Sequence, residues 1–128
     1  MSIKIDISYG ELLDKITILE IKAERIADAA KLANISRELE VLTTTWNNGG
    51  IDTEAVNSQR HKLKQINESL WNIEDEIRDH EAAKSFGDSF IALARSVYKT
   101  NDQRAAVKKE INDLLGSALT EEKSYQAY

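Results

Sequence analysis

The sequence contains no proline and no cysteine in its 128 residues, and it has only five glycines. Proline interrupts helices and glycine weakens their interiors, so a chain with so little of either favours long, uninterrupted helices. The absence of cysteine excludes a disulfide framework and every site that depends on thiolate ligands or on thiol redox chemistry.

Long apolar runs and concentrated positive charge are also missing. No apolar stretch approaches the roughly 20 residues that span a bilayer, and the first residues, MSIKIDIS, lack the apolar region of a signal peptide. We therefore expect no membrane partner and a cytoplasmic location. The formal net charge is −5, and Lys and Arg are spread along the chain, so we expect no nucleic-acid partner.

The residues that are present are typical of a globular protein, since 41% are hydrophobic and 30% are charged. A length of 128 residues suits one domain with a single core. We predict an all-α domain over residues 1–128, an antiparallel bundle of about five helices with a long central helical hairpin. The predicted helices cover residues 8–27, 29–47, 52–83, 87–98 and 101–116.

Capping residues and apolar spacing support these boundaries. Residues that suit a helix N-terminus precede four segments: Ser8, Asp28, Asp52 and Thr100, with Glu11 and Gln103 completing two capping boxes. The sequence NNGG at 47–50 and Gly116 provide stops, because these residues tolerate positive φ. Apolar residues between Val56 and Ile77 follow a nearly heptad spacing, which predicts the seam of a coiled-coil-like hairpin.

Residues 1–7 form a short N-terminal extended arm in this prediction. Ile3, Ile5 and Ile7 alternate with polar residues, which is the period of a strand. A single strand needs a partner, and the candidates are the same segment of another chain or the C-terminal tail, EEKSYQAY at residues 121–128. A frayed terminus fits the pattern equally well.

Four stretches of the sequence resemble a small, uncharacterised bacterial family of all-helical proteins, a domain of unknown function. The stretches are ISYGELLDKITILEIKAERI, KLANISRELEVL, LWNIEDEIRDHE and FIALARSVYKTNDQRAAVKKEINDLLGS. The resemblance covers nearly the whole chain. It implies a self-contained helical protein from a bacterium or phage, and it implies no reaction, because the family has none assigned.

Residues 95–110, RSVYKTNDQRAAVKKE, contain a candidate site for a small anion. A helix that begins after Thr100 would present free N–H groups, and a helix N-terminus beside guanidinium groups binds phosphate or carboxylate. The candidate ligand-binding residues are Arg95, Tyr98, Asn101, Arg104 and Lys108. The alternative is a solvated helix face, in which Asp102 neutralises the helix dipole and pairs with Arg95.

A weaker alternative is a Mg²⁺ site formed by carboxylates of two helices. Asp75 and Asp79 share one helix face, and Glu11 and Asp14 can supply a second pair from the first helix. Ordinary intrahelical ion pairs explain much of the same acidic pattern. Without that site, we expect no cofactor.

The sequence leaves two hypotheses for the function. In the favoured one, the protein is a self-associating or protein-interaction module, most simply a homodimer, because the heptad-like stripe and the N-terminal arm both require partners. In the alternative, it binds or transforms a small anionic ligand such as a phosphate, nucleotide or carboxylate, with or without Mg²⁺.

Overall fold

The computed structural model describes residues 1–128 and contains four α-helices and no strand. The helices are α1 (Tyr9–Arg25), α2 (Ala29–Gly49), α3 (Glu54–Ala82) and α4 (Asp88–Leu115). The all-α prediction is confirmed, and the prediction of five helices is wrong. The segments predicted at 87–98 and 101–116 form one continuous helix, because Thr100 lies inside α4 and caps no helix.

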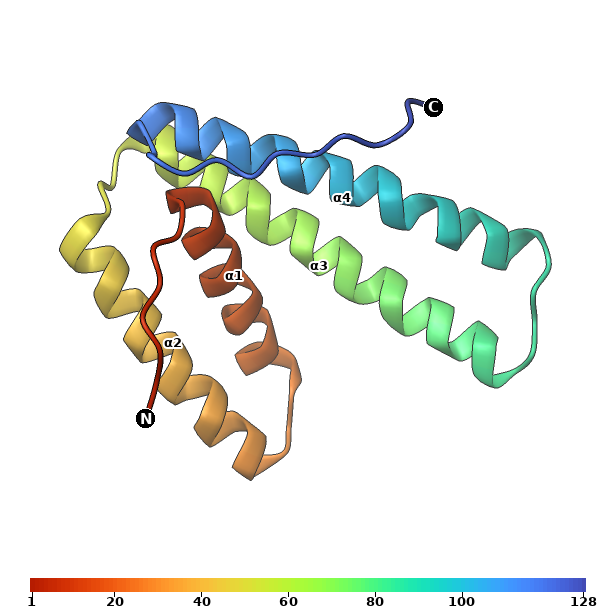
Figure 1. Cartoon of the computed structure of the whole chain (residues 1–128). Coiled ribbons are helices and arrows are strands. Elements are labelled where there is room, and N and C mark those ends of the chain that lie inside the picture. The colour runs from red at the N-terminus through yellow and green to blue at the C-terminus, as the bar shows by residue number, and fades with distance from the viewer.

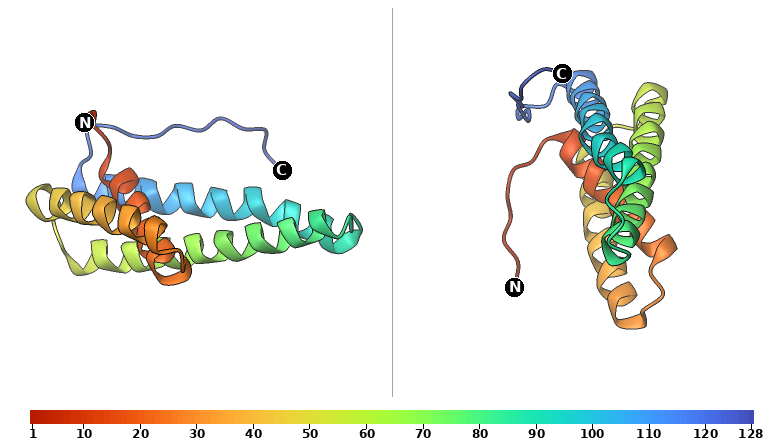
Figure 2. Two further views of the ribbon diagram at one scale, coloured as in Figure 1. Left: turned by 90° about the horizontal axis from the view of Figure 1, so that it is seen from below. Right: turned by 90° about the vertical axis from the view of Figure 1, so that its right-hand side faces the viewer.

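The four helices form two antiparallel hairpins, α1–α2 and α3–α4, that lie across one another (Figures 1 and 2). Helix α1 is the shared element, since it packs against the other three helices, whereas the backbone of α2 lies close to α1 alone. The long predicted hairpin is therefore α3–α4. None of the four helices is long and apolar enough to cross a lipid bilayer.

Side-chain caps begin the first three helices. The Ser8 hydroxyl accepts the backbone N–H of Glu11 at 3.1 Å, and the Asp28 carboxylate accepts that of Lys31 at 2.9 Å, as predicted. The cap of α3 is Thr53 and not Asp52. The Asp52 carboxylate instead accepts a 3.0 Å hydrogen bond from the indole Nε1 of Trp46.

Glycines end α2 and α4 in two different ways. Gly116 ends the last helix, as predicted, and its φ of 62° is the left-handed conformation that glycine favours. Gly50 has a φ of −86°, so positive φ is not its role. A Cβ at residue 50 would lie 2.5 Å from the Trp46 ring, which explains why a residue without a side chain ends α2.

Residues 1–7 form no strand, so the predicted pairing of the N-terminal arm is absent from this chain. The arm runs as an irregular segment away from α1 (Figure 2). Ile3 and Ile5 are largely exposed, and Ile7 packs against the core.

The core lies where the two hairpins cross. It consists of eight buried apolar side chains from all four helices: Leu12, Leu13, Ile16, Trp46, Val56, Leu63, Val107 and Ile111. Only 18 of the 128 residues are buried, and none of them lies between Asn67 and Val107. The outer part of the α3–α4 hairpin, residues 70–100, therefore extends beyond the core, and we call it the hairpin arm (Figure 1).

Candidate functional site

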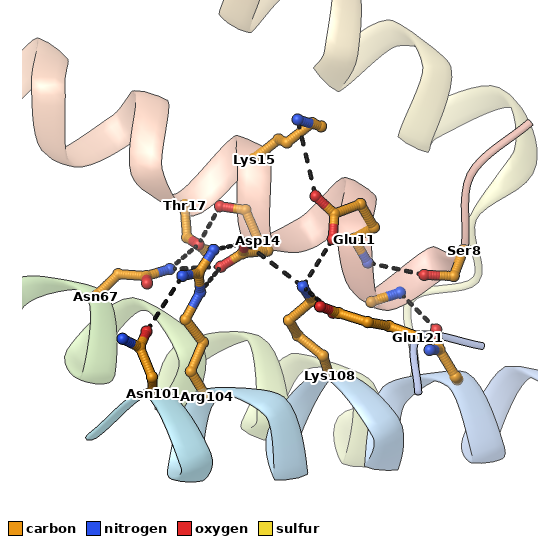
Figure 3. Close-up of polar contacts among 12 residues, drawn as sticks. Ser8, Glu11, Asp14, Lys15, Thr17, Asn67, Asn101, Arg104, Lys108 and Glu121 are labelled. Carbon is orange, nitrogen blue, oxygen red and sulfur yellow. Dashed lines mark hydrogen bonds and ion pairs between the residues drawn. The ribbon is translucent and has the colours of Figure 1, made fainter. Parts of the chain in front are cut away.

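A buried carboxylate at the crossing of α1 and α4 anchors a cluster of charged side chains (Figure 3). Asp14 of α1 has only 1% of its surface exposed. Arg104 of α4 donates two hydrogen bonds to this carboxylate. Its Nε donates to Oδ1 at 2.9 Å, and its Nη2 donates to Oδ2. This two-point geometry matches a planar guanidinium to a carboxylate, and it fixes the rotation of α1 against α4.

Lys108, one turn after Arg104 on α4, is the second cation of this cluster. Its Nζ lies 2.7 Å from Oε2 of Glu11, 2.7 Å from Oε2 of Glu121 and 3.9 Å from Oδ2 of Asp14. The Lys108 side chain is only 8% exposed. Three carboxylates thus surround one buried ammonium group, and Glu121 ties the C-terminal tail to α4.

Neutral side chains complete the same cluster. The amide Nδ2 of Asn67, on α3, donates to the Asp14 carboxylate at 3.0 Å and to the Thr17 hydroxyl at 3.1 Å. One turn before Asp14, the backbone N–H of Gly10 donates to the Asn112 side chain at 2.7 Å. A Cβ at residue 10 would lie 2.4 Å from the backbone oxygen of Lys108, so α1 approaches α4 too closely for any larger residue.

The charges shift one another's pKa values in the directions that ion pairing dictates. Burial disfavours the charged form of Asp14, but hydrogen bonds from Arg104 and Asn67 outweigh it and hold the pKa of the carboxyl below its ordinary value. Burial likewise opposes the charge of Lys108, and the hydrogen bonds to Glu11 and Glu121 outweigh it and raise the pKa of Lys108. Both groups are therefore charged at neutral pH.

These contacts satisfy the polar groups of the crossing without a ligand. No buried side-chain nitrogen or oxygen in the structure lacks a hydrogen-bond partner. The polar cluster, which we define as Glu11, Asp14, Thr17, Asn67, Arg104, Lys108 and Glu121, therefore acts first as a structural connection between α1, α3, α4 and the tail.

The structure brings together three of the five residues predicted to bind an anion. Asn101, Arg104 and Lys108 lie along one side of α4, and Oδ1 of Asn101 accepts from Nη1 of Arg104 at 3.5 Å. Arg95 is exposed without an ion-pair partner, and nine residues of helix place it on the side of α4 opposite Arg104. Tyr98 packs edge-on against Tyr128 of the tail, with ring centroids 5.2 Å apart.

The helix start on which that anion prediction relied is absent. Residues 101–103 lie in the middle of α4, so their N–H groups bond within the helix and are not free for a ligand. Arg104 and Lys108 instead bind carboxylates of α1. Two of the residues predicted to bind an anion are thus paired with two of the predicted metal ligands, Glu11 and Asp14.

The four predicted Mg²⁺ ligands are not assembled either. Glu11 and Asp14 bind the cations of α4, whereas Asp75 and Asp79 are exposed on the hairpin arm. No group of three or more His, Asp or Glu side chains is placed to hold a metal ion.

A cleft opens beside the polar cluster, in the angle between α1 and the hairpin arm. It has a volume of about 420 Å³, and we call it the elbow cleft. Apolar side chains of α1 and α3 line it, including Ile18, Ile21, Leu70 and Trp71. Three cations also line it, namely Lys22 of α1, Arg78 of α3 and Arg104 of α4.

The hairpin arm carries apolar side chains that no third helix covers. Leu70, Ile73, Ile77, Phe90, Leu93 and Val97 are only half-buried. Phe86, Ile91 and Tyr98 are exposed by 50%, 53% and 43%. At the tip, the Phe86 and Phe90 rings pack edge-on with centroids 5.2 Å apart.

Sequence reasoning missed Asn67, Thr17 and the pairing of Asp14 with Arg104. A signal for the last was present, because Leu93, Val97, Thr100, Arg104 and Val107 continue one stripe at intervals of four and three. A cation on an apolar stripe requires a buried partner. The periodicity also argued for a single helix through Thr100.

Comparisons with known proteins identify a family and assign no activity. A family model described as a family of unknown function (DUF6165) matches residues 3–128. No curated protein and no solved structure matches the chain. Because the match covers nearly all of the residues described above, the chain belongs to the DUF6165 family.

Proposed function

We propose that this protein is a self-associating helical module, in which the hairpin arms of two copies pack together as a four-helix bundle. One observation carries the proposal: no residue from 68 to 106 is buried, although this segment contains apolar side chains at helical spacing. Two helices alone cannot enclose the seam between them, and stable helical proteins cover such seams with further helices.

A second copy of the chain suits this surface because Ile91 and Tyr98 lie two turns apart on one face of α4, close to the aromatic tip. A twofold interface uses the same patch on both partners, so here the apolar patch of each copy would be buried by that of the other. Ile91, which is 53% exposed, is then an anchor of the contact, and Phe86 lies toward the tip.

The charges of the arm also favour an antiparallel partner of the same kind. The outer part of α3 is acidic, with Glu74, Asp75, Glu76, Asp79 and Glu81. The matching part of α4 carries Arg95 and Lys99, which are exposed and have no ion-pair partner within the chain. Packing α3 of one copy beside α4 of the other would bring the two signs together.

The test is sedimentation equilibrium of the wild type and of Ile91→Glu over a wide range of concentrations. Burying a charge in place of an isoleucine costs at least about 1.5 kcal/mol in each copy. A twofold interface contains the change twice, so the dimer should weaken by about 3 kcal/mol, which is more than 100-fold in Kd.

Val41→Glu is the matched control, because Val41 is 59% exposed on α2, away from the arm. We expect this variant to dimerise like the wild type. A wild type that remains monomeric at millimolar concentration, or a dimer that Ile91→Glu and Val41→Glu affect equally, would contradict the proposal.

A further inference from the structure

We infer that the elbow cleft binds a small monocarboxylate with a flat apolar body. Its volume of about 420 Å³ lies within the range of about 300–1,000 Å³ of small-molecule sites. Four of its ten lining residues are apolar and the other six are charged or polar, so it can contact both an apolar body and a charged group of one ligand. The inference is independent of self-association, because one chain supplies every group that it requires.

The apolar part of the cleft offers a flat surface to a ring. Ile18, Ile21 and Leu70 form the floor beside the half-buried ring of Trp71. The guanidinium of Arg25 lies 6.0 Å from the centroid of that ring, and its Nη1 donates to Asn72 at 2.6 Å. The hydrogen bond to Asn72 holds Arg25 beside the ring, and Arg25 is not among the residues that line the cleft.

One of the three cations that line the cleft has no carboxylate within ion-pair distance. Asp14 balances Arg104, and Glu74 lies 3.5 Å from Arg78. Lys22 is half-buried in the wall of the cleft and has neither an ion pair nor a hydrogen bond. A half-buried ammonium group without an ion-pair partner is a favourable counterion for one carboxylate, because partial removal from water strengthens the pair.

Arg104 supplies directional hydrogen bonds for the same carboxylate. A guanidinium has five N–H donors, of which two bind Asp14 and one binds Asn101. Two donors remain, the Arg104 side chain is 28% exposed, and the residue lines the cleft. Because Asp14 fixes the plane of the group, these donors need little reordering when a ligand binds.

The acids at the rim select for a single negative charge. Asp75 lines the cleft, is exposed and has no ion-pair partner, and Glu74 lies beside it. Glu74 and Asp75 would repel a dianionic phosphate more strongly than a monocarboxylate, because the phosphate carries twice the charge. A monocarboxylate keeps the attraction of Lys22 and meets less of this repulsion. The cleft therefore suits a carboxylate better than a phosphate ester.

The two tryptophans provide a direct test. In a ¹H–¹⁵N spectrum, the indole signal of Trp71 should shift and saturate as 3-phenylpropionate is added. Trp46 is an internal reference, since its ring is 1% exposed and its indole N–H is bonded to Asp52. The variant Trp71→Phe assigns the two signals.

Three comparisons decide the outcome. The neutral amide of 3-phenylpropionate should bind the wild type about ten-fold more weakly than the acid does. Lys22→Gln should bind 3-phenylpropionate about ten-fold more weakly than the wild type does. Phenyl phosphate should bind the wild type more weakly than 3-phenylpropionate. Lys31→Gln, an exposed cation of α2 outside the cleft, should leave binding unchanged. A Trp71 signal that never moves, an equal response to acid and amide, or tighter binding of phenyl phosphate would overturn the inference.

Discussion

Replacing Asp14 by Asn tests whether the polar cluster holds the two hairpins together. The change keeps the shape of the side chain and removes its charge. Arg104 then loses its counterion, and one N–H group of the new amide faces an N–H group of the guanidinium. Removing one partner of a buried ion pair costs about 3–5 kcal/mol, because the other charge stays buried.

The lower end of that range applies to this pair. The Arg104 side chain is 28% exposed, so water can reach the orphaned guanidinium in part. Lys108 keeps Glu11 and Glu121 and needs little rearrangement. We expect Asp14→Asn to lower the free energy of unfolding by about 3 kcal/mol, or about 10 °C in Tm for a chain of this size.

Urea titration followed by circular dichroism at 222 nm measures this loss. Glu20→Gln is the control, since Glu20 lies on the same helix and its contact with Arg60 is 3.8 Å long with both side chains about a third exposed. Such a pair contributes at most about 1 kcal/mol. Equal losses in the two variants would refute the structural role of the cluster.

The pH dependence gives the same prediction an independent check. The folded pKa of Asp14 is lowered, so the stability that its charge contributes is complete above the unfolded value of about 4 and is lost as the pH falls through the folded pKa. The difference between wild type and Asp14→Asn should therefore shrink in acid. A difference that stays constant down to pH 2 would mean that the charge is not responsible.

Two further substitutions probe the local geometry. In urea titration, Gly10→Ala should lower the free energy of unfolding by about 1–3 kcal/mol, because the new Cβ would meet the backbone of α4. Gly49→Ala is the control: a Cβ there has nothing within 4 Å, so the loss should be at most about 0.5 kcal/mol, as for a surface substitution. Asp52→Ala removes the acceptor of the Trp46 indole and should lower stability by about 1 kcal/mol. An unchanged free energy of unfolding in either Gly10→Ala or Asp52→Ala would contradict the corresponding contact.

Local sequence signals predicted the helices better than their packing. The Ser8 and Asp28 caps and the left-handed end at Gly116 each depend on a few neighbouring residues, and all three are present in the structure. The Thr100 capping box failed because Thr and Gln also occur inside helices. The stripe from Leu93 to Val107 continues through it, and a continuous apolar stripe was the stronger signal.

The candidate site was harder to predict because its partners are distant in sequence. Asp14 and Arg104 are 90 positions apart, and helical periodicity does not say which helices pack together. The same limit explains why the acids and the cations were assigned to two separate sites. Two residues of each set, Glu11 and Asp14 from the acids and Arg104 and Lys108 from the cations, are partners of one another.

The position of Arg104 links the core of the molecule to its elbow cleft. One edge of its guanidinium is bound to Asp14, and the remaining donors lie where the hairpin arm leaves the core. A variant of Arg104 would therefore change both stability and binding, and it could not separate the two roles. Lys22 has no hydrogen bond or ion pair with any member of the cluster, so Lys22→Gln changes the charge of the cleft and removes no polar bond between α1 and α4. If the cleft is a binding site, binding and stability will respond to different residues of α1, Lys22 near its end and Asp14 near its start.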